Sequence, residues 1–157
     1  MVLPIVILAI IFHDSLCPLG HGCYIQREKE QKLHDALSRS PVVAILGPRQ
    51  SGKSTTAKML LKKTPSVYLD LQDRVDRNKL LEPELFFDRY RDKLICLDEI
   101  QLLPEFFSVL RSEIDKDRRP GRFLILGSAS RDLIKQSTES LAGHIAYIDL
   151  TPFIVKE

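Results

Sequence analysis

From residue 24 onward, five short runs rich in hydrophobic residues are separated by longer, more polar segments. Each run has the length of a β-strand and is rich in apolar residues. The run at residues 42–46 is apolar throughout, which is typical of a strand that is buried on both faces of a parallel sheet. The predicted strands span residues 42–46, 66–70, 93–99, 122–128 and 144–150.

The segments between these strands carry apolar stripes at helical spacing. Pro83 is expected to begin a new helix within residues 74–91, with Leu85, Phe86 and Tyr90 facing the core. The inner face of a helix at residues 101–115 carries Leu103, Phe106, Phe107, Leu110 and Ile114. The predicted helices span residues 26–38, 55–63, 74–91, 101–115 and 130–141.

Strands and helices alternate along most of the chain. This order predicts an α/β fold with three layers, in which helices cover both faces of a parallel sheet of about five strands. A chain of 157 residues is long enough for one such domain with a substantial core and too short for two large ones.

A glycine-containing loop connects the first predicted strand to the first helix after it. Residues 47–54 read Gly, four residues, Gly, Lys and Ser, and Thr55 follows. The strand before the loop and the helix after it form the context that distinguishes a phosphate-binding loop from a chance match. The alternative is an ordinary turn before a Lys-rich helix, and this context disfavours it. The predicted nucleotide-binding residues are Gly47, Pro48, Arg49, Gln50, Ser51, Gly52, Lys53, Ser54 and Thr55.

The residue types in this loop suit the chemistry of phosphate. Glycines allow several backbone N–H groups to converge, and they let a phosphate approach without a Cβ atom in the way. The helix that follows directs its N-terminal partial positive charge to the same place. We expect Lys53 to reach the β- and γ-phosphates and the Ser54 hydroxyl to bind Mg²⁺.

Polar residues end the third and fourth predicted strands, at the edge where parallel sheets bind ligands. Asp98 is expected to hold Mg²⁺ together with Ser54, usually through water, and Glu99 to polarise the attacking water. Ser128 would help to position that water or contact the γ-phosphate, an assignment that rests on the architecture. The alternative for Asp98 and Glu99 is that they cap the next helix.

Composition and charge narrow the function classes only slightly. Hydrophobic residues make up 44% of the chain and charged residues 28%, as in soluble globular proteins. A net charge of +2 gives no case for a nucleic-acid partner and excludes none that binds a local patch. Cys17, Cys23 and Cys96 are too few and too scattered for a disulfide framework, so we expect a cytoplasmic protein in which Cys96 is a small buried residue.

The N-terminal segment differs from the rest. Residues 2–12 are mostly apolar, but the run is too short to span a bilayer as a helix and lacks the flanks of a secretory signal. We therefore expect residues 1–23 to be a poorly ordered leader that precedes a globular unit at residues 24–157. Metal-ligand residue types occur in the leader at a spacing that matches no familiar zinc pattern: His13, Cys17, His21 and Cys23.

Taken together, these residues resemble the prokaryotic AAA-type ATPases whose ATPase domain precedes a C-terminal domain of unknown function. The resemblance extends from about Tyr24 to Phe153. The phosphate-binding loop alone indicates only a P-loop NTPase, whereas the order of all the matching segments is far more specific. Those segments are residues 47–55, 97–101, 123–130, 139–143 and 150–153.

The resemblance implies a P-loop fold of the additional-strand type, with its central strands in the order 5-1-4-3-2. It implies Mg²⁺ and ATP as cofactor and substrate, with residues 47–54 as the Walker A motif and Asp98 and Glu99 in the Walker B motif. It also implies that Glu99 and Lys53 are catalytic and that Ser128 is a sensor-like polar group.

The chain departs from the family in two ways. His144 stands where relatives usually have an arginine, about where AAA-type proteins place an arginine finger. A histidine is mostly neutral at pH 7, and arginine fingers contribute roughly 10³-fold or more in rate, so we expect slower hydrolysis. The chain also stops where the family's lid and C-terminal domain would begin, which predicts a truncated ATPase core.

The leading functional hypothesis is an ATP-binding, Mg²⁺-dependent ATPase core that acts on an unknown protein client. The alternative is a nucleotide-binding switch or interaction module with little or no turnover, which His144 and the missing lid favour. Glu99 disfavours a small-molecule kinase, and the absence of a helix-turn-helix or zinc pattern disfavours a DNA-associated ATPase. A homo-oligomer is compatible with the sequence, and no membrane span is expected.

Overall fold

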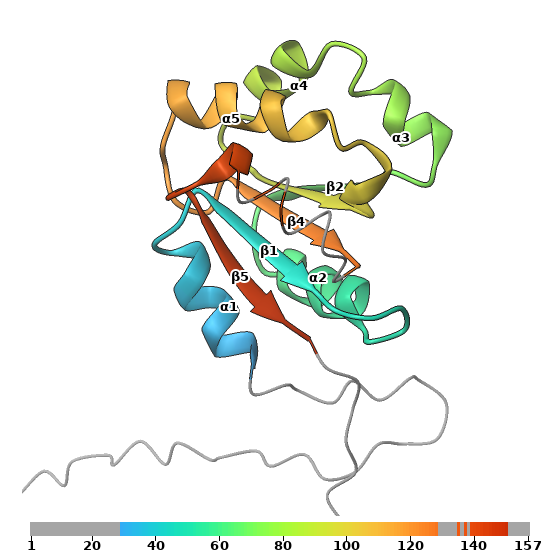
Figure 1. The fold of residues 1–157 in the computed structure, drawn as a ribbon, viewed down its shortest axis with the longest axis vertical. Helices are drawn as coiled ribbons and strands as arrows, with labels where there is room; N and C mark the ends of the chain where they lie inside the picture. Colours follow the sequence, from blue (N-terminus) through green and yellow to red (C-terminus); the bar gives the residue numbers. More distant parts are fainter. Residues whose placement is uncertain (1–28, 129–134, 136, 138, 151–157) are drawn as a thin grey trace, which may run out of the picture.

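The computed structural model describes residues 29–128, 135, 137 and 139–150. A five-stranded sheet runs through it in the order β2-β3-β4-β1-β5, and neighbouring strands are parallel (Figure 1). This is the predicted order read from the opposite edge, and each predicted strand is confirmed to within a residue at either end. The strands are β1 Val42–Leu46, β2 Ser66–Asp70, β3 Leu94–Asp98, β4 Phe123–Gly127 and β5 Ile145–Asp149.

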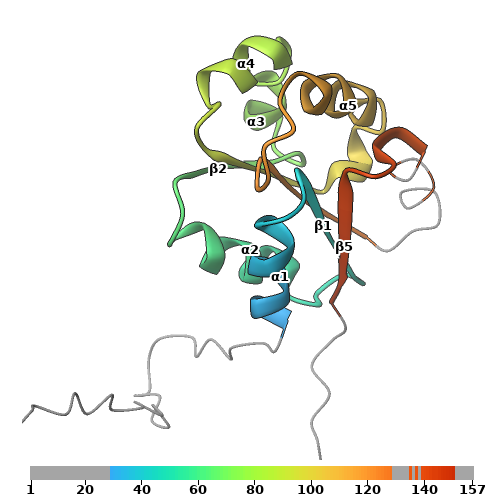
Figure 2. The same cartoon turned by 90° about the vertical axis from the view of Figure 1, so that its left-hand side faces the viewer.

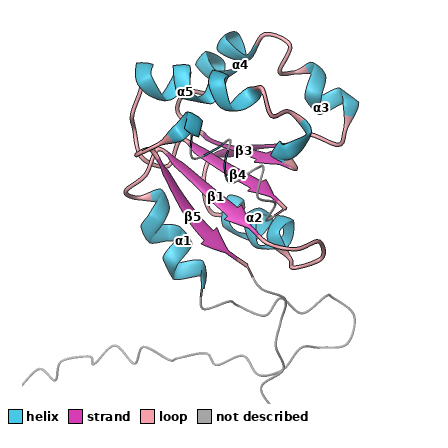
Figure 3. Cartoon of the chain, viewed as in Figure 1, coloured by secondary structure: helices cyan, strands magenta, loops and turns pink. Residues whose placement is uncertain are grey.

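Helices cover both faces of this sheet, as the alternating pattern predicts. Figures 2 and 3 show α1 and α2 on one face and α3, α4 and α5 on the other, which gives three layers. The described residues of the predicted 130–141 helix, namely 135, 137 and 139–141, are also helical. The other helices are α1 Lys29–Leu37, α2 Lys53–Leu61, α3 Arg74–Asn78, α4 Pro83–Arg89, the 3₁₀ turn η1 Ile100–Leu102, and α5 Phe106–Lys116.

Alternation along β1 separates two hydrophobic cores. Val42, Ala44 and Leu46 belong to the core under α4 and α5, whereas Val43 and Ile45 belong to the core under α1 and α2. Successive side chains of a strand point to opposite faces, so a strand that is covered on both sides must be apolar at every position. This explains the uninterrupted hydrophobic run in the sequence.

The helix before β4 begins later than the sequence pattern predicts. We expected it to start at residue 101, but residues 100–102 form η1 and α5 begins at Phe106. Pro104 lies between them and has no backbone N–H to donate to a preceding turn. The apolar face itself is confirmed, because Phe106, Phe107, Leu110 and Ile114 are all buried.

The buried face of α4 also differs from the prediction. Leu85 is 66% exposed, and the fully buried residue of α4 is Phe87. The Phe87 ring packs edge-on against Phe106 and Phe123, with ring centroids 6.0 and 5.2 Å away. Phe86 and Tyr90 are partly buried against the same core, as predicted. The contact with β4, which lies far away in sequence, sets the rotation of this short helix.

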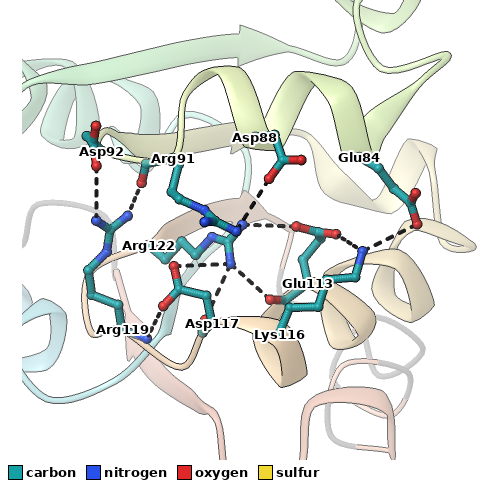
Figure 4. Close-up of polar contacts among 9 residues, drawn as sticks. All are labelled: Glu84, Asp88, Arg91, Asp92, Glu113, Lys116, Asp117, Arg119 and Arg122. Atoms are coloured by element: carbon teal, nitrogen blue, oxygen red, sulfur yellow. Dashed lines mark hydrogen bonds and ion pairs between the residues drawn. The ribbon is translucent and has the colours of Figure 1, made fainter.

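A buried ion pair joins the end of α5 to the start of β4. The side chain of Arg122 is 1% exposed, and its Nη2 lies 2.9 Å from Glu113 Oε2 (Figure 4). Nη1 of Arg122 also donates to the Glu113 carbonyl at 2.9 Å and lies 3.6 Å from Asp117 Oδ2. Lys116 approaches the other carboxylate oxygen of Glu113 at 2.7 Å. The guanidinium is thus paired at several points, which a buried cation requires.

Breaking this ion pair should destabilise the domain strongly. Glu113→Gln removes the charge that faces Arg122 and leaves a buried guanidinium poorly compensated, so we expect the free energy of unfolding to fall by about 3 kcal/mol. Urea unfolding followed by circular dichroism measures this change. The matched control is Asp88→Asn, which removes a solvent-exposed partner of Arg91 at 3.5 Å and should leave the free energy of unfolding nearly unchanged. Equal effects of the two variants would contradict the prediction.

Candidate nucleotide-binding site

The carboxyl ends of all five strands meet at one edge of the sheet because the strands are parallel. A cleft of about 580 Å³ opens there, and its volume lies in the range of small-molecule sites. The structure thereby brings the predicted loop and the predicted catalytic carboxylate together. The cleft is lined by Arg49, Gln50, Gly52, Lys53, Ser54, Thr55 and Glu99.

The glycines of the loop have different physical roles. Gly52 lies in the left-handed region, with φ 81°, just before α2. Gly47 is needed for close packing, because a Cβ atom there would lie 2.3 Å from the Leu150 carbonyl oxygen and 2.8 Å from Ser51 Oγ. The lack of a side chain at Gly47 therefore makes room for Leu150 at the end of β5, whereas the sequence pattern predicts that it lets a phosphate approach.

The loop leads directly into the first turn of α2, which begins at Lys53. Its first intrahelical hydrogen bond runs from the Thr56 N–H to the Gly52 carbonyl at 2.9 Å. The backbone N–H groups of residues 53–55 therefore have no partner within the helix. They lie at the positive end of the helix dipole, and the side chains of these residues line the cleft. This arrangement suits an anion.

Lys53 is folded back onto the loop. Its Nζ atom donates to the carbonyls of Gly47 and Pro48 at 2.9 Å each, and the residue is only 7% exposed. The two carbonyl oxygens hold the amino group of Lys53 at the inner side of the loop. A bound phosphate would compete with these carbonyls for the same donor protons.

Asp98 ends β3 and is 3% exposed. Its Oδ1 accepts a hydrogen bond from the Glu99 N–H at 2.9 Å, and its Oδ2 accepts one from the Tyr68 hydroxyl. Burial, followed by the nearby Asp98 carboxylate, raises the pKa of Tyr68 well above its usual range. Asp98 does not itself line the cleft, although Glu99, the next residue, does.

Glu99 has an unusual backbone conformation for a residue with a side chain. Its φ is 59°, in the left-handed region that favours Gly, Asn and Asp. The carboxylate accepts a hydrogen bond from the side-chain amide of Gln101, whose Oε1 is buried without a hydrogen-bond partner. The turn directs the Glu99 side chain to the cleft instead of along a continuing strand.

Two contacts were not predicted from the sequence. The sequence pattern predicts only that Tyr68 belongs to a strand, and its contact with Asp98 depends on the pairing of β2 with β3. The sequence pattern predicts Gln101 at the start of the helix before β4, but Gln101 lies in the 3₁₀ turn η1, where its side chain contacts Glu99. The predicted strand order places β2 beside β3 and so brings Tyr68 near Asp98. The sequence does not give the register of the two strands, and the contact depends on it.

Two other residues of interest lie outside the cleft. Ser128 follows β4 at the same edge and is half-buried, but it does not line the cleft. His144 precedes β5 and therefore lies at the opposite edge of the sheet, where its carbonyl accepts a hydrogen bond from the Val42 N–H at 3.1 Å. His144 cannot contact a phosphate that is held by the loop of its own chain.

The donor set suits Mg²⁺ better than a transition metal. Within the described residues there is no group of three or more His, Cys, Asp and Glu side chains that could hold a metal ion. Magnesium usually keeps several waters and needs only one or two protein oxygens in addition to phosphate. The Ser54 hydroxyl and the Asp98 carboxylate are oxygen donors of the required kind. Cys96 is buried and unpaired, as predicted, and Cys17 and Cys23 lie outside the described residues.

Comparison with known proteins agrees with this geometry. Residues 39–157 match the family described as an AAA domain, which is more than half of the chain. This chain belongs to the AAA domain family. The predicted resemblance to AAA-type ATPases and the P-loop NTPase fold are thereby confirmed, whereas the accompanying C-terminal domain of unknown function stays a prediction.

Two curated relatives of this AAA domain are uncharacterised mycobacterial proteins. Mb2031c of Mycobacterium bovis and Rv2008c of Mycobacterium tuberculosis are each 40% identical to it over 148 residues. Each match covers 92% of this chain and 33% of the relative. The chain therefore spans about a third of the length of the curated relatives that it matches.

Solved structures share the fold at low sequence identity. The Walker-type ATPase PABY2304 of Pyrococcus abyssi aligns with a TM-score of 0.56 at 17% identity, covering 83% of this chain and 54% of that one. The Bacteroides protein Pif1, solved bound to single-stranded DNA, aligns with a TM-score of 0.54 at 13% identity and covers 84% and 43%. Within the described part of this AAA domain, no helix is long and apolar enough to cross a bilayer.

The strained backbone at Glu99 gives a testable difference between two substitutions. Asn adopts left-handed φ values more readily than Gln, and both substitutions remove the charge. We expect Glu99→Asn to be more stable than Glu99→Gln by about 0.5–1 kcal/mol, measured by urea unfolding. Equal stabilities would show that this conformation carries little strain.

Proposed function

We propose that this AAA domain binds ATP with Mg²⁺ and hydrolyses it. The observation that carries the proposal is the shared lining of one cleft by Lys53, Ser54 and Glu99, which come from two different strand ends. A cation, a helix N-terminus and a carboxylate around one cavity are the groups that attack of water on a terminal phosphate requires. The fold-level likeness to P-loop ATPases supports the same reaction class.

Each loop residue has a distinct part in this proposal. The backbone N–H groups at the start of α2 and the Lys53 ammonium would bind the phosphate oxygens and offset their charge. Arg49 and Gln50, which are exposed at the mouth of the cleft, would contact the outer part of the nucleotide. Gly47 and Ser51 are buried below and shape the loop.

The Mg²⁺ ion would be held by the Ser54 hydroxyl and, through water, by Asp98. When bound, this ion neutralises charge on the β- and γ-phosphates. Glu99 would accept a hydrogen bond from the attacking water and orient it toward the γ-phosphate, with Lys53 stabilising the charge that develops. Ser128, at the end of the neighbouring strand β4, is assigned to the sensor-like position by the family resemblance.

The domain assignment is part of the proposal as well. We place the ATPase core at residues 24–157 in the cytoplasm, with residues 1–23 as a leader outside the catalytic unit. The core would act on a protein client, alone or as a homo-oligomer, without a nucleic-acid reader of its own. The lid and the C-terminal domain, which the resemblance associates with such cores, would couple ATP hydrolysis to the client.

Two substitutions separate binding from turnover. Lys53→Ala should weaken ATP binding at least a hundredfold, because it removes the cation that faces the phosphates, whereas Glu99→Gln should bind ATP like the parent and lose turnover by about 10² or more. Fluorescent-nucleotide titration measures binding, and phosphate release measures turnover. The control Lys62→Ala removes an exposed lysine at the far end of α2 and should change neither. If Lys53→Ala binds ATP as well as the parent, the loop is not a nucleotide site.

A second candidate function is a nucleotide-dependent switch that turns over ATP hardly at all. The position of His144 favours it, since the usual arginine is missing there and this edge of the sheet is remote from the chain's own loop. A single-turnover assay with excess enzyme distinguishes the two functions. ATP binding without phosphate release identifies the switch.

The substitution His144→Arg tests whether residue 144 acts on the site of its own chain or on the site of a neighbouring copy. At protein concentrations at which the chain is monomeric, His144→Arg should release phosphate at the rate of the parent, because residue 144 lies at the opposite edge of the sheet from the loop of its own chain. A rate gain that appears only as the protein concentration rises would assign residue 144 to the site of a neighbouring copy. A faster monomeric variant would contradict the opposite-edge placement.

A further inference from the structure

The carboxylate of Asp98 is held by two donors from different elements. Oδ1 accepts from the Glu99 N–H at 2.9 Å, and Oδ2 accepts from the hydroxyl of Tyr68 on β2. Each carboxylate oxygen has two lone pairs, so both oxygens keep capacity for a further donor. At 3% exposure, Asp98 has little access to bulk water that could replace the tyrosine hydroxyl.

The ring of Tyr68 also contacts the helix that follows the phosphate-binding loop. Nζ of Lys58 lies 4.7 Å from the centroid of the Tyr68 ring, within the range of a cation–π contact. Lys58 lies one helical turn after Ser54 on α2. Tyr68 therefore contacts both elements that supply the proposed Mg²⁺ ligands, α2 through Lys58 and β3 through Asp98.

We propose that Tyr68 is a positioning residue for the Mg²⁺ site, which fixes the orientation of the Asp98 carboxylate relative to Ser54. The inference rests on the proposed function. The χ2 torsion of an aspartate is broad, so hydrogen bonds and not the rotamer alone fix the plane of its carboxylate. With Tyr68 in place, the free lone pairs of Asp98 are held in one direction. Without the hydroxyl, a buried oxygen lacks its donor and the carboxylate rotates to recover one.

The test measures the Mg²⁺ dependence of nucleotide binding in Tyr68→Phe. This substitution removes only the hydroxyl and keeps the ring that contacts Lys58. A fluorescent ATP analogue is titrated at increasing Mg²⁺ and also in EDTA. We expect a rise of about tenfold in the Mg²⁺ concentration at which the affinity for the ATP analogue has increased by half of its full amount, as is typical when a residue that orients a metal ligand is lost. Binding of the analogue in EDTA should stay unchanged.

Tyr90→Phe is the matched control. Tyr90 is a partly buried tyrosine at the end of α4, and its ring packs against Phe86 with centroids 4.8 Å apart. This residue belongs to the core under α4 and α5, on the other side of the sheet from α2. The same loss of a phenolic oxygen at that place should leave the Mg²⁺ requirement unchanged. An equal shift in both variants would show a general loss of packing and overturn the proposal.

A double-mutant cycle shows whether Tyr68 acts through Asp98. If it does, Tyr68→Phe should add no further rise in the Mg²⁺ requirement once Asp98→Asn is present. Full additivity, or an unchanged Mg²⁺ requirement in Tyr68→Phe alone, overturns the inference. If Tyr68→Phe melts below the assay temperature, the variant Lys58→Met is used in its place. We expect this variant to raise the Mg²⁺ requirement of nucleotide binding about twofold, because it removes the contact between Lys58 and the Tyr68 ring. An unchanged Mg²⁺ requirement in Lys58→Met overturns the inference as well.

The parent protein separates this inference from the proposed function. If the parent does not bind the ATP analogue, or binds it equally with Mg²⁺ and with EDTA, the proposed function itself fails, and the inference fails with it. If the parent shows Mg²⁺-dependent binding and Tyr68→Phe shows the same dependence, only the role of Tyr68 is wrong.

Discussion

Parallel pairing of the strands is the constraint on which the site depends. Hydrogen bonds in register along β1, β3, β4 and their neighbours place every strand's carboxyl end at one edge of the sheet. Side chains that are distant in sequence, such as Lys53 and Glu99, therefore line the same cleft. The two hydrophobic cores hold the sheet in this arrangement from both sides.

The opposite edge of the sheet is organised by different interactions. There the buried pair of Arg122 and Glu113 fixes the start of β4 to the end of α5. Arg122 at this edge is paired with Glu113 inside the fold, whereas Lys53 at the other edge donates to two loop carbonyls. One edge of the sheet thus carries a buried structural ion pair, and the other carries the proposed nucleotide site.

Most of the fold could be predicted from the sequence, because local patterns determine the buried strands and the loop between β1 and α2. The errors occur where tertiary contacts decide the outcome. Phe87 is buried in place of Leu85 because Phe106 and Phe123 lie opposite it. The contact of Tyr68 with Asp98 requires knowledge of register, which an apolar pattern does not specify. The proximity of Glu99 to the loop was predictable from parallel topology alone, but its left-handed turn was not.

The tight fit of Gly47 against Leu150 has a consequence for mechanics. The Leu150 N–H bonds the Leu46 carbonyl at 2.7 Å, and its own carbonyl occupies the space that a side chain at position 47 would need. Leu150, which directly follows β5, is therefore anchored against the start of the loop at residues 47–54. Any movement of the loop at Gly47 therefore has to displace the Leu150 backbone as well, which couples the conformation of the loop to the end of β5.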